Sequence, residues 1–131
     1  MLSLIDIIST LSEITGEKIE KNYAEDNFSF LKVLKGETKE PVRENLIYIS
    51  SANKLAIVND GWKYIDCLGS GGFTDPANVK PVKGGPRGQL YNLNIDPLES
   101  INLYLKDKEK VNQLSELLDS IVKQDYSRKE K

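Results

Sequence analysis

Residues that could carry out chemistry are few in this sequence of 131 residues, which has no histidine and one cysteine, Cys67. The absence of histidine removes the commonest general base and the commonest ligand of transition metals. Cys67 lies in an expected strand, which favours a small buried side chain over a nucleophile. Four aspartates are explained by turns and strand ends rather than by convergence on a metal, namely Asp60, Asp66, Asp75 and Asp96. We therefore expect neither catalytic residues nor a metal site or cofactor in this chain.

Two neighbouring apolar runs, residues 45–50 and 54–68, dominate the centre of the chain. The second run is divided by Asn59-Asp60-Gly61, and an Asp-Gly step between apolar segments favours a hairpin. A further alternating segment, residues 89–93, is typical of a short strand. These patterns predict three short antiparallel strands at the centre, with residues 89–93 as another strand.

Helical spacing appears near both ends of the sequence. Residues 3–15 carry an apolar stripe at helical intervals, formed by Leu4, Ile7, Ile8, Leu11 and Ile14. Residues 107–123 predict a second helix with Asp107 as its N-cap and a buried face of Val111, Leu114, Leu117, Leu118, Ile121 and Val122. A shorter apolar insert at residues 28–34 predicts one or two helical turns. The pattern as a whole predicts an α+β fold.

Composition and charge exclude several classes of function. The formal net charge is −2, whereas dedicated nucleic-acid binders show a clear basic excess, so we expect no nucleic-acid partner. No run approaches the roughly 18 apolar residues of a membrane helix, so we expect no membrane span. The glycine-rich segment 69–76 is not a phosphate-binding loop, because it lacks a Gly-Lys-Ser or Gly-Lys-Thr ending. The surrounding loop, residues 69–88, is long enough to be functional.

Five passages, taken in order along the chain, resemble motifs found late in sulfatases of the arylsulfatase type. Residues 25–36 resemble the "ED-x-x-SF-LPVLKG" passage, and residues 41–44 resemble the "PxRE" that precedes the next strand. Residues 55–65 are similar to the "FAIR-x-G-x-WKLI" hairpin, and residues 69–76 to the "GSGGWSDP" loop. Residues 89–103 resemble the "LYNLxxDPxExxNL" signature before the terminal helix. One departure is at Tyr48 and Ile49, which stand where bacterial relatives often have histidine.

The resemblance implies the C-terminal portion of a sulfatase, with a four-stranded antiparallel sheet covered by a C-terminal helix. It assigns residues 1–42 to the tail end of the catalytic domain and residues 43–131 to the C-terminal subdomain. It also implies that calcium, formylglycine and the catalytic residues belong to a missing N-terminal catalytic domain, and that the parent protein is exported. Cys67 does not match the formylglycine motif C/S-x-P/A-x-R, because Leu68 and Gly69 follow it.

The expected role of this chain is a scaffold that borders the cleft for a sulfated small molecule or glycan and is inactive alone. The candidate cleft residues all lie in the long loop, namely Ser70, Phe73, Thr74, Asp75 and Arg87. Guanidinium matches the geometry of sulfate, which favours Arg87. The stripe on residues 3–15 is expected to be half exposed in the isolated chain, or buried by self-association. Two alternatives remain open: a free-standing protein-interaction module, and the equivalent piece of a related phosphoesterase.

Overall fold

The computed structural model describes residues 1–20 and 23–124, and it confirms the α+β fold. These residues form two compact units. Residues 45–120 make up one unit, and residues 1–44 make up the other, to which the end of the last helix from Ile121 also belongs. Each unit is described by itself below.

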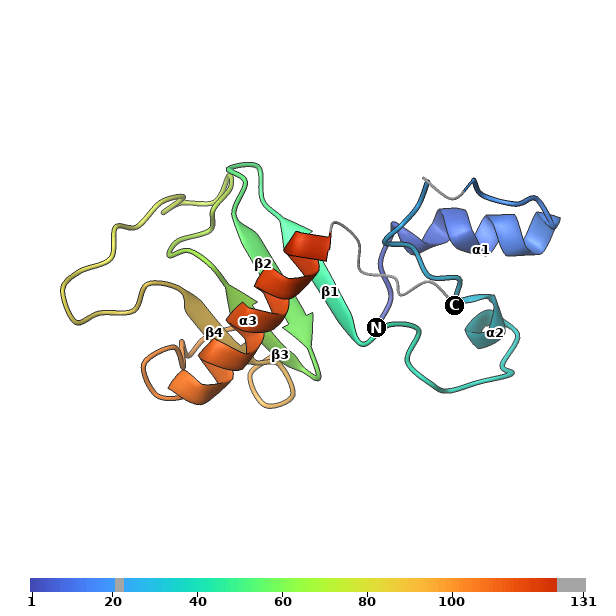
Figure 1. Cartoon of the computed structure of the whole chain (residues 1–131). Helices are drawn as coiled ribbons and strands as arrows, with labels where there is room; N and C mark the ends of the chain where they lie inside the picture. The colour runs from blue at the N-terminus through green and yellow to red at the C-terminus, as the bar shows by residue number, and fades with distance from the viewer. Residues whose placement is uncertain (21–22, 125–131) are drawn as a thin grey trace. The chain divides into compact units, whose positions relative to one another are not determined.

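The unit of residues 45–120 is built on a four-stranded antiparallel sheet with the strands in sequence order (Figure 1). The strands are β1 (Asn45–Ile49), β2 (Leu55–Asn59), β3 (Trp62–Ile65) and β4 (Gln89–Asn92). Strand β3 ends three residues before the expected Leu68. The backbone of Asp66 still bonds Leu55, and the chain then leaves the sheet at Gly69, where φ is +80°.

The predicted hairpin turn between β2 and β3 is confirmed. Asp60 and Gly61 both have positive φ, +47° and +73°, which is the combination that a two-residue turn needs to match the strand twist. Asn59 therefore pairs with Trp62, and the register continues through Ile57 opposite Tyr64. A Cβ at position 61 would lie 2.3 Å from the side chain of Asn94, so glycine is required there for space as well.

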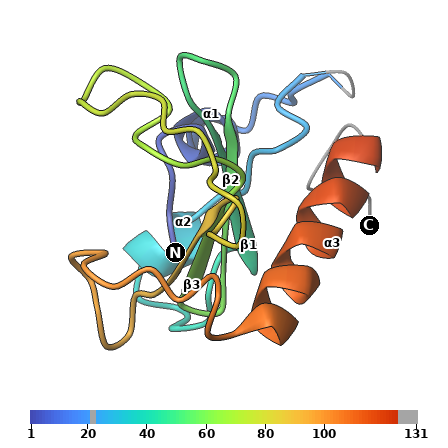
Figure 2. The same cartoon turned by 90° about the vertical axis from the view of Figure 1, so that its left-hand side faces the viewer.

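Helix α3 (Lys108–Gln124) lies along one face of the sheet, which Figures 1 and 2 show from two directions. Its first turn is capped as expected, because the Lys110 N–H donates to the Asp107 carboxylate at 3.0 Å. The core between helix and sheet contains fully buried apolar side chains that include Ile57, Leu90 and Leu114. Val122 was expected on the buried face of this helix, but its side chain is 47% exposed.

The outer edge of β4 is closed by the segment that follows residue 100. The side-chain oxygen of Asn102 accepts the Leu90 N–H at 3.1 Å, and its amide group donates to the Gly88 carbonyl at 3.2 Å. The Leu103 N–H then donates to the Leu90 carbonyl at 2.8 Å. Both backbone groups of Leu90 that face away from β3 are thus satisfied.

In the N-terminal unit, helix α1 (Asp6–Thr15) begins three residues later than the expected Ser3. The Ser3 N–H donates to the Asp6 carboxylate at 2.8 Å, so the Asp6 side chain satisfies a donor at the first turn, and the Ser3 side chain forms no cap. A one-turn helix, α2 (Leu31–Leu34), confirms the short helical insert.

None of the helices among the residues described is long and apolar enough to cross a membrane.

The buried face of α1 is polar, and its apolar face is exposed. Asp6, Ser9 and Thr10 are its buried residues, whereas Ile7, Ile8, Leu11 and Ile14 are 43–55% exposed and Leu4 is 85% exposed. The expectation of a half-exposed stripe is confirmed. A patch of this kind marks an interaction surface more often than ordinary protein surface.

Asp6 organises the unit because its buried carboxylate collects donors from three separate segments. It accepts the Phe28 N–H at 3.0 Å and the Arg43 Nε–H at 3.2 Å, and it also bonds Nη2 of Arg43. Nη2 of Arg43 donates further to the Asp26 carbonyl at 3.0 Å, and the guanidinium lies 4.8 Å from the Phe28 ring centroid. The side chains of Asp6 and Arg43 are 0% and 2% exposed, so each compensates the buried charge of the other.

Replacing Asp6 with alanine should therefore leave a buried guanidinium without its carboxylate. We expect the free energy of unfolding, measured with urea, to fall by about 3–5 kcal/mol. Glu13→Ala on the exposed side of the same helix is the matched control and should change it by less than about 0.5 kcal/mol. Equal losses in the two variants would contradict this role for the buried pair.

A second prediction concerns the loss of folding stability at low pH, to which protonation of the Asp96 carboxylate contributes. Its carboxylate accepts the backbone N–H groups of Ser100 (3.0 Å) and Ile101 (2.9 Å), and these bonds hold its pKa below the ordinary value of 3.8. Since the pKa is lowered on folding, the stabilisation is complete above pH 3.8 and is lost as the pH falls through the lowered value. Asp96→Asn should flatten the loss of stability in this window, measured by urea unfolding at pH 5 and at pH 2.5. Asp119→Asn on α3 is the control, and an identical effect there would contradict the prediction.

Candidate functional site

The five candidate cleft residues in loop 69–88 are all exposed. Phe73 is 96% exposed, and Thr74 and Asp75 follow it at the surface. The Ser70 hydroxyl donates to the Thr74 carbonyl at 2.5 Å and accepts the Gly72 N–H at 3.1 Å, so this side chain shapes the turn that presents Phe73. Arg87 lies just before β4 and forms no hydrogen bond with the other four candidates among the described contacts.

The base of the loop is fixed by backbone and side-chain hydrogen bonds. The N–H groups of Ser70 and Gly71 donate to the carbonyls of Pro76 and Ala77 at 3.0 and 2.9 Å, which closes residues 70–77 on themselves. The Gln89 amide donates to the carbonyls of Cys67 and Gly69 at 3.0 and 2.9 Å. The loop therefore leaves the sheet with a defined backbone although its tip is exposed.

Gly71 joins this loop to the turn between β1 and β2. It has φ +63°, and a Cβ at this position would lie 3.2 Å from Lys54 Cβ, 3.2 Å from Ser50 Oγ and 3.3 Å from Cys67 Sγ. The Gly71 carbonyl also accepts the Ala52 N–H at 3.3 Å. Two segments that are distant in sequence are thus packed together at a single glycine.

Next to this junction, a pocket of about 260 Å³ opens on the sheet face opposite α3. That it lies on this face follows from the register: Trp62 and Tyr64 of β3 face α3, where Lys110 lies over the Trp62 ring, whereas Lys63 and Ile65, which alternate with them, line the pocket. The remaining lining residues are Tyr48, Ile49, Ser50, Lys54, Ala56, Cys67 and Ser70. Ser70 is the candidate residue that the structure places in this pocket, and Phe73, Thr74, Asp75 and Arg87 are not in its lining.

The charges of the pocket come from two lysines with different surroundings. Lys63 Nζ lies 2.6 Å from a carboxylate oxygen of Glu99, so its charge is neutralised locally. No carboxylate among residues 1–20 and 23–124 lies within ion-pair distance of Lys54 Nζ. Lys54 was not singled out from the sequence, where it is one of many surface lysines. Tyr48 and Ile49 stood out only as replacements of histidine.

Cys67 is not an activated thiol. Burial raises the pKa of the thiol, the Lys54 ammonium offsets part of this increase, and the carboxylate of Asp66 adds a smaller increase. A higher pKa means less thiolate at neutral pH and a weaker nucleophile. Its flanking sequence lacks the formylglycine motif, and no group of three or more His, Cys, Asp or Glu in the described part of the chain could hold a metal. These residues do not fit the formylglycine and calcium that the resemblance implies for the catalytic domain.

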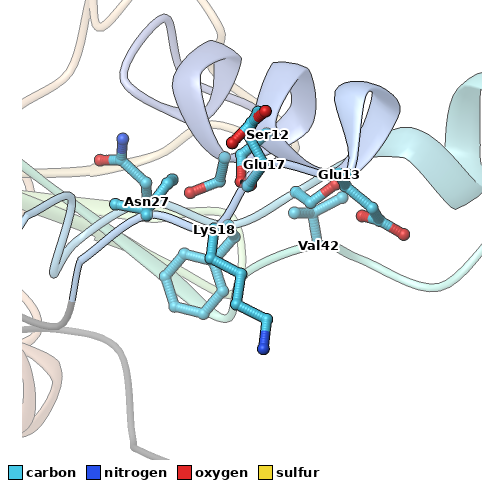
Figure 3. Close-up of a pocket in the computed structure, with 11 residues that line it drawn as sticks. Ser12, Glu13, Glu17, Lys18, Asn27 and Val42 are labelled. Carbon is cyan, nitrogen blue, oxygen red and sulfur yellow. Dashed lines mark hydrogen bonds between the residues drawn. The ribbon is translucent and has the colours of Figure 1, made fainter.

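A larger pocket, of about 660 Å³, lies in the N-terminal unit beside α1 (Figure 3). Ser12 and Glu13 reach it from the helix, and Lys18, Asn27 and Val42 reach it from the connecting segments. The Ser12 hydroxyl is already bonded to the Glu17 carbonyl. Glu13, Glu17 and Lys18 are exposed, so they retain their solvent contacts and form no desolvated acid–base pair.

The close approach of Gly71 to the turn between β1 and β2, beside the smaller pocket, can be tested by substitution. Gly71→Ala should lower the free energy of unfolding by about 1–2 kcal/mol, because the new Cβ meets a left-handed backbone and three close neighbours. Gly72→Ala is the matched control, since φ there is not positive and the nearest atom would be at an ordinary 3.6 Å. Thermal unfolding of both variants, followed by circular dichroism, measures the difference. Similar melting temperatures would contradict the junction described above.

Comparison with known proteins identifies relatives in one class of enzyme. No family model matches the chain. It is 31% identical over 129 residues to an N-acetylgalactosamine-6-O-sulfatase of Bacteroides thetaiotaomicron, an alignment that covers 92% of this chain and 23% of the relative. The chain therefore spans about a quarter of the length of this protein.

Comparison with solved structures also identifies sulfatases, and it supports the fold. A sulfatase structure from work on the metabolism of multiple glycosaminoglycans by Bacteroides thetaiotaomicron matches with a TM-score of 0.68 and 31% identity, over 88% of this chain and 24% of that one. A 2-O GAG sulfatase matches with a TM-score of 0.63 and 19% identity, over 91% of this chain and 24% of that one, and supports the fold alone. By sequence and by structure, this chain resembles the C-terminal portion of a sulfatase, as its motifs predict.

Proposed function

We propose that this chain works as the C-terminal portion of a sulfuric ester hydrolase, where it braces a catalytic domain and borders the substrate cleft, and that it is inactive alone. The observation that carries the proposal is the exposed apolar face of α1. Four of its isoleucine and leucine side chains are 43–55% exposed although the helix is firmly bonded on its polar side. Such a face gains stability when another surface covers it.

The relatives are longer than this chain, and we propose that the part this chain lacks is the surface that covers the apolar face of α1. Because the chain spans 23–24% of them, about three quarters of a comparable protein would lie outside it. We assign residues 1–42 to the end of the catalytic domain and residues 43–131 to the C-terminal subdomain, of which residues 125–131 lie outside the described part. The missing N-terminal catalytic domain is then the partner of α1, and it contributes the nucleophile, the formylglycine and the calcium.

Loop 69–88 supports the cleft-bordering role. Its base is held by hydrogen bonds to Gln89, while Ser70, Phe73, Thr74, Asp75 and Arg87 remain exposed and available for a ligand. The ligand class we propose is a sulfated small molecule or glycan, in keeping with the N-acetylgalactosamine-6-O-sulfatase relative. We further propose that the parent protein is exported.

A chimera tests the bracing role. The Bacteroides thetaiotaomicron sulfatase, with its matching portion replaced by this chain, should release sulfate from N-acetylgalactosamine 6-sulfate, whereas this chain alone should not. Ile8→Asp with Leu11→Asp in the chimera should lower soluble yield and activity at least tenfold, because both carboxylates would be buried at the interface. Sulfate release measured by ion chromatography gives the activity.

The controls use exposed apolar residues away from α1. Ile95→Asp with Leu98→Asp, at side chains 79% and 85% exposed, should leave yield and activity within twofold. Sulfate release by this chain alone, or an unaffected Ile8/Leu11 variant, would contradict the proposal. Release of phosphate from the matching phosphate ester in place of sulfate would favour the phosphoesterase alternative.

A further inference from the structure

The pocket on the sheet face opposite α3 combines an apolar floor with a lysine that has no carboxylate partner among the described residues. Ala56 and Ile65 supply the floor, and Tyr48, which pairs with Ala56 on the same sheet face, adds a half-exposed aromatic ring. The hydroxyls of Ser50 and Ser70 and the ammonium of Lys54 are its polar groups. Pockets that orient a small ligand have this composition, with apolar walls and a few placed polar groups.

The backbone of Lys54 is fixed before any ligand binds. The Ser50 N–H donates to the Lys54 carbonyl at 2.9 Å, and the Lys54 N–H donates to the Ser50 hydroxyl at 3.0 Å. The backbone of Gly71 passes close to this side chain, since a Cβ at position 71 would lie 3.2 Å from Lys54 Cβ. Only the outer part of the lysine has to be ordered on binding, which reduces the entropic cost of an ion pair.

The charge of Lys54 distinguishes it from the other lysine of the pocket. Lys63 is already paired with Glu99, so an incoming anion would compete with a bound carboxylate. Lys54 has no such partner among the described residues, and it lines the pocket beside Ser50 and Cys67. An anionic ligand group would therefore be drawn to Lys54 rather than to Lys63.

We propose that this pocket holds an acidic sugar residue of the substrate, with a carboxylate or sulfate ester that is not the one hydrolysed placed at Lys54. The apolar face of the sugar ring would lie on the floor and against Tyr48. The proposal rests on the function proposed above and adds a preference for substrates that carry a second negative charge. Lys54 then acts as a specificity residue and takes no part in bond cleavage.

Titrations of the isotope-labelled 131-residue chain at low ionic strength test this, followed through its backbone amide signals. Three probes separate the sources of charge: an unsulfated disaccharide with a uronate, N-acetylgalactosamine 6-sulfate, and neutral N-acetylgalactosamine. The acidic probes should shift the amides of residues 48–56 and 63–71. Lys54→Ala should weaken their binding about two- to fivefold, the range expected for one exposed ion pair. The neutral sugar should bind both forms equally.

Two variants keep the test specific. Lys80→Ala removes an exposed lysine of loop 69–88 outside the pocket and should leave all three affinities unchanged. Lys54→Arg keeps the charge and should retain binding within twofold. The inference is overturned if Lys54→Ala and Lys80→Ala behave alike, if the shifted amides lie elsewhere, or if no probe shifts any amide. These results are independent of the chimera, whose failure would instead remove the sulfatase role.

Discussion

The buried bond between Asp6 and Arg43 determines which way helix α1 faces. A carboxylate with no exposed surface needs its donors close by, and here they come from Ser3, Phe28 and Arg43. The helix must therefore keep Asp6 and Thr10 inward, and its periodicity then places Ile7, Ile8, Leu11 and Ile14 on the outside. In a self-contained domain, a helix with this sequence would turn its apolar stripe toward the core. The observed outward orientation is the one expected when a further protein surface covers the stripe.

The second unit also combines a packed core with surface that stays accessible. One face of its sheet is closed by α3 around Ile57, Leu90 and Leu114. The other face has a pocket at the end where loop 69–88 begins. In both units the packed core explains stability, and the accessible surface carries the proposed contacts: a catalytic domain at α1, and a ligand at the pocket and the exposed loop.

Local chemistry made most of the fold predictable from the sequence. The Asp60-Gly61 turn fixed the β2–β3 hairpin, and Asp107 marked the start of α3. The burial of Asp6 could not be predicted, because its partner Arg43 lies 37 positions away and meets it only in the tertiary structure. The pocket could not be predicted, since Tyr48, Lys54 and Ser70 converge through strand register and through the close contact at Gly71. Whether the loop residues singled out from the sequence touch a ligand stays a prediction.

The side chain of Asn102 has a consequence for behaviour in concentrated solution. A strand at the border of a sheet offers unpaired amides and carbonyls to other chains, which is a common route to aggregation. Asn102 and Leu103 occupy those groups at Leu90, so the β4 border does not present them to a neighbouring molecule. Any growth of this sheet by addition of a foreign strand would have to start from β1.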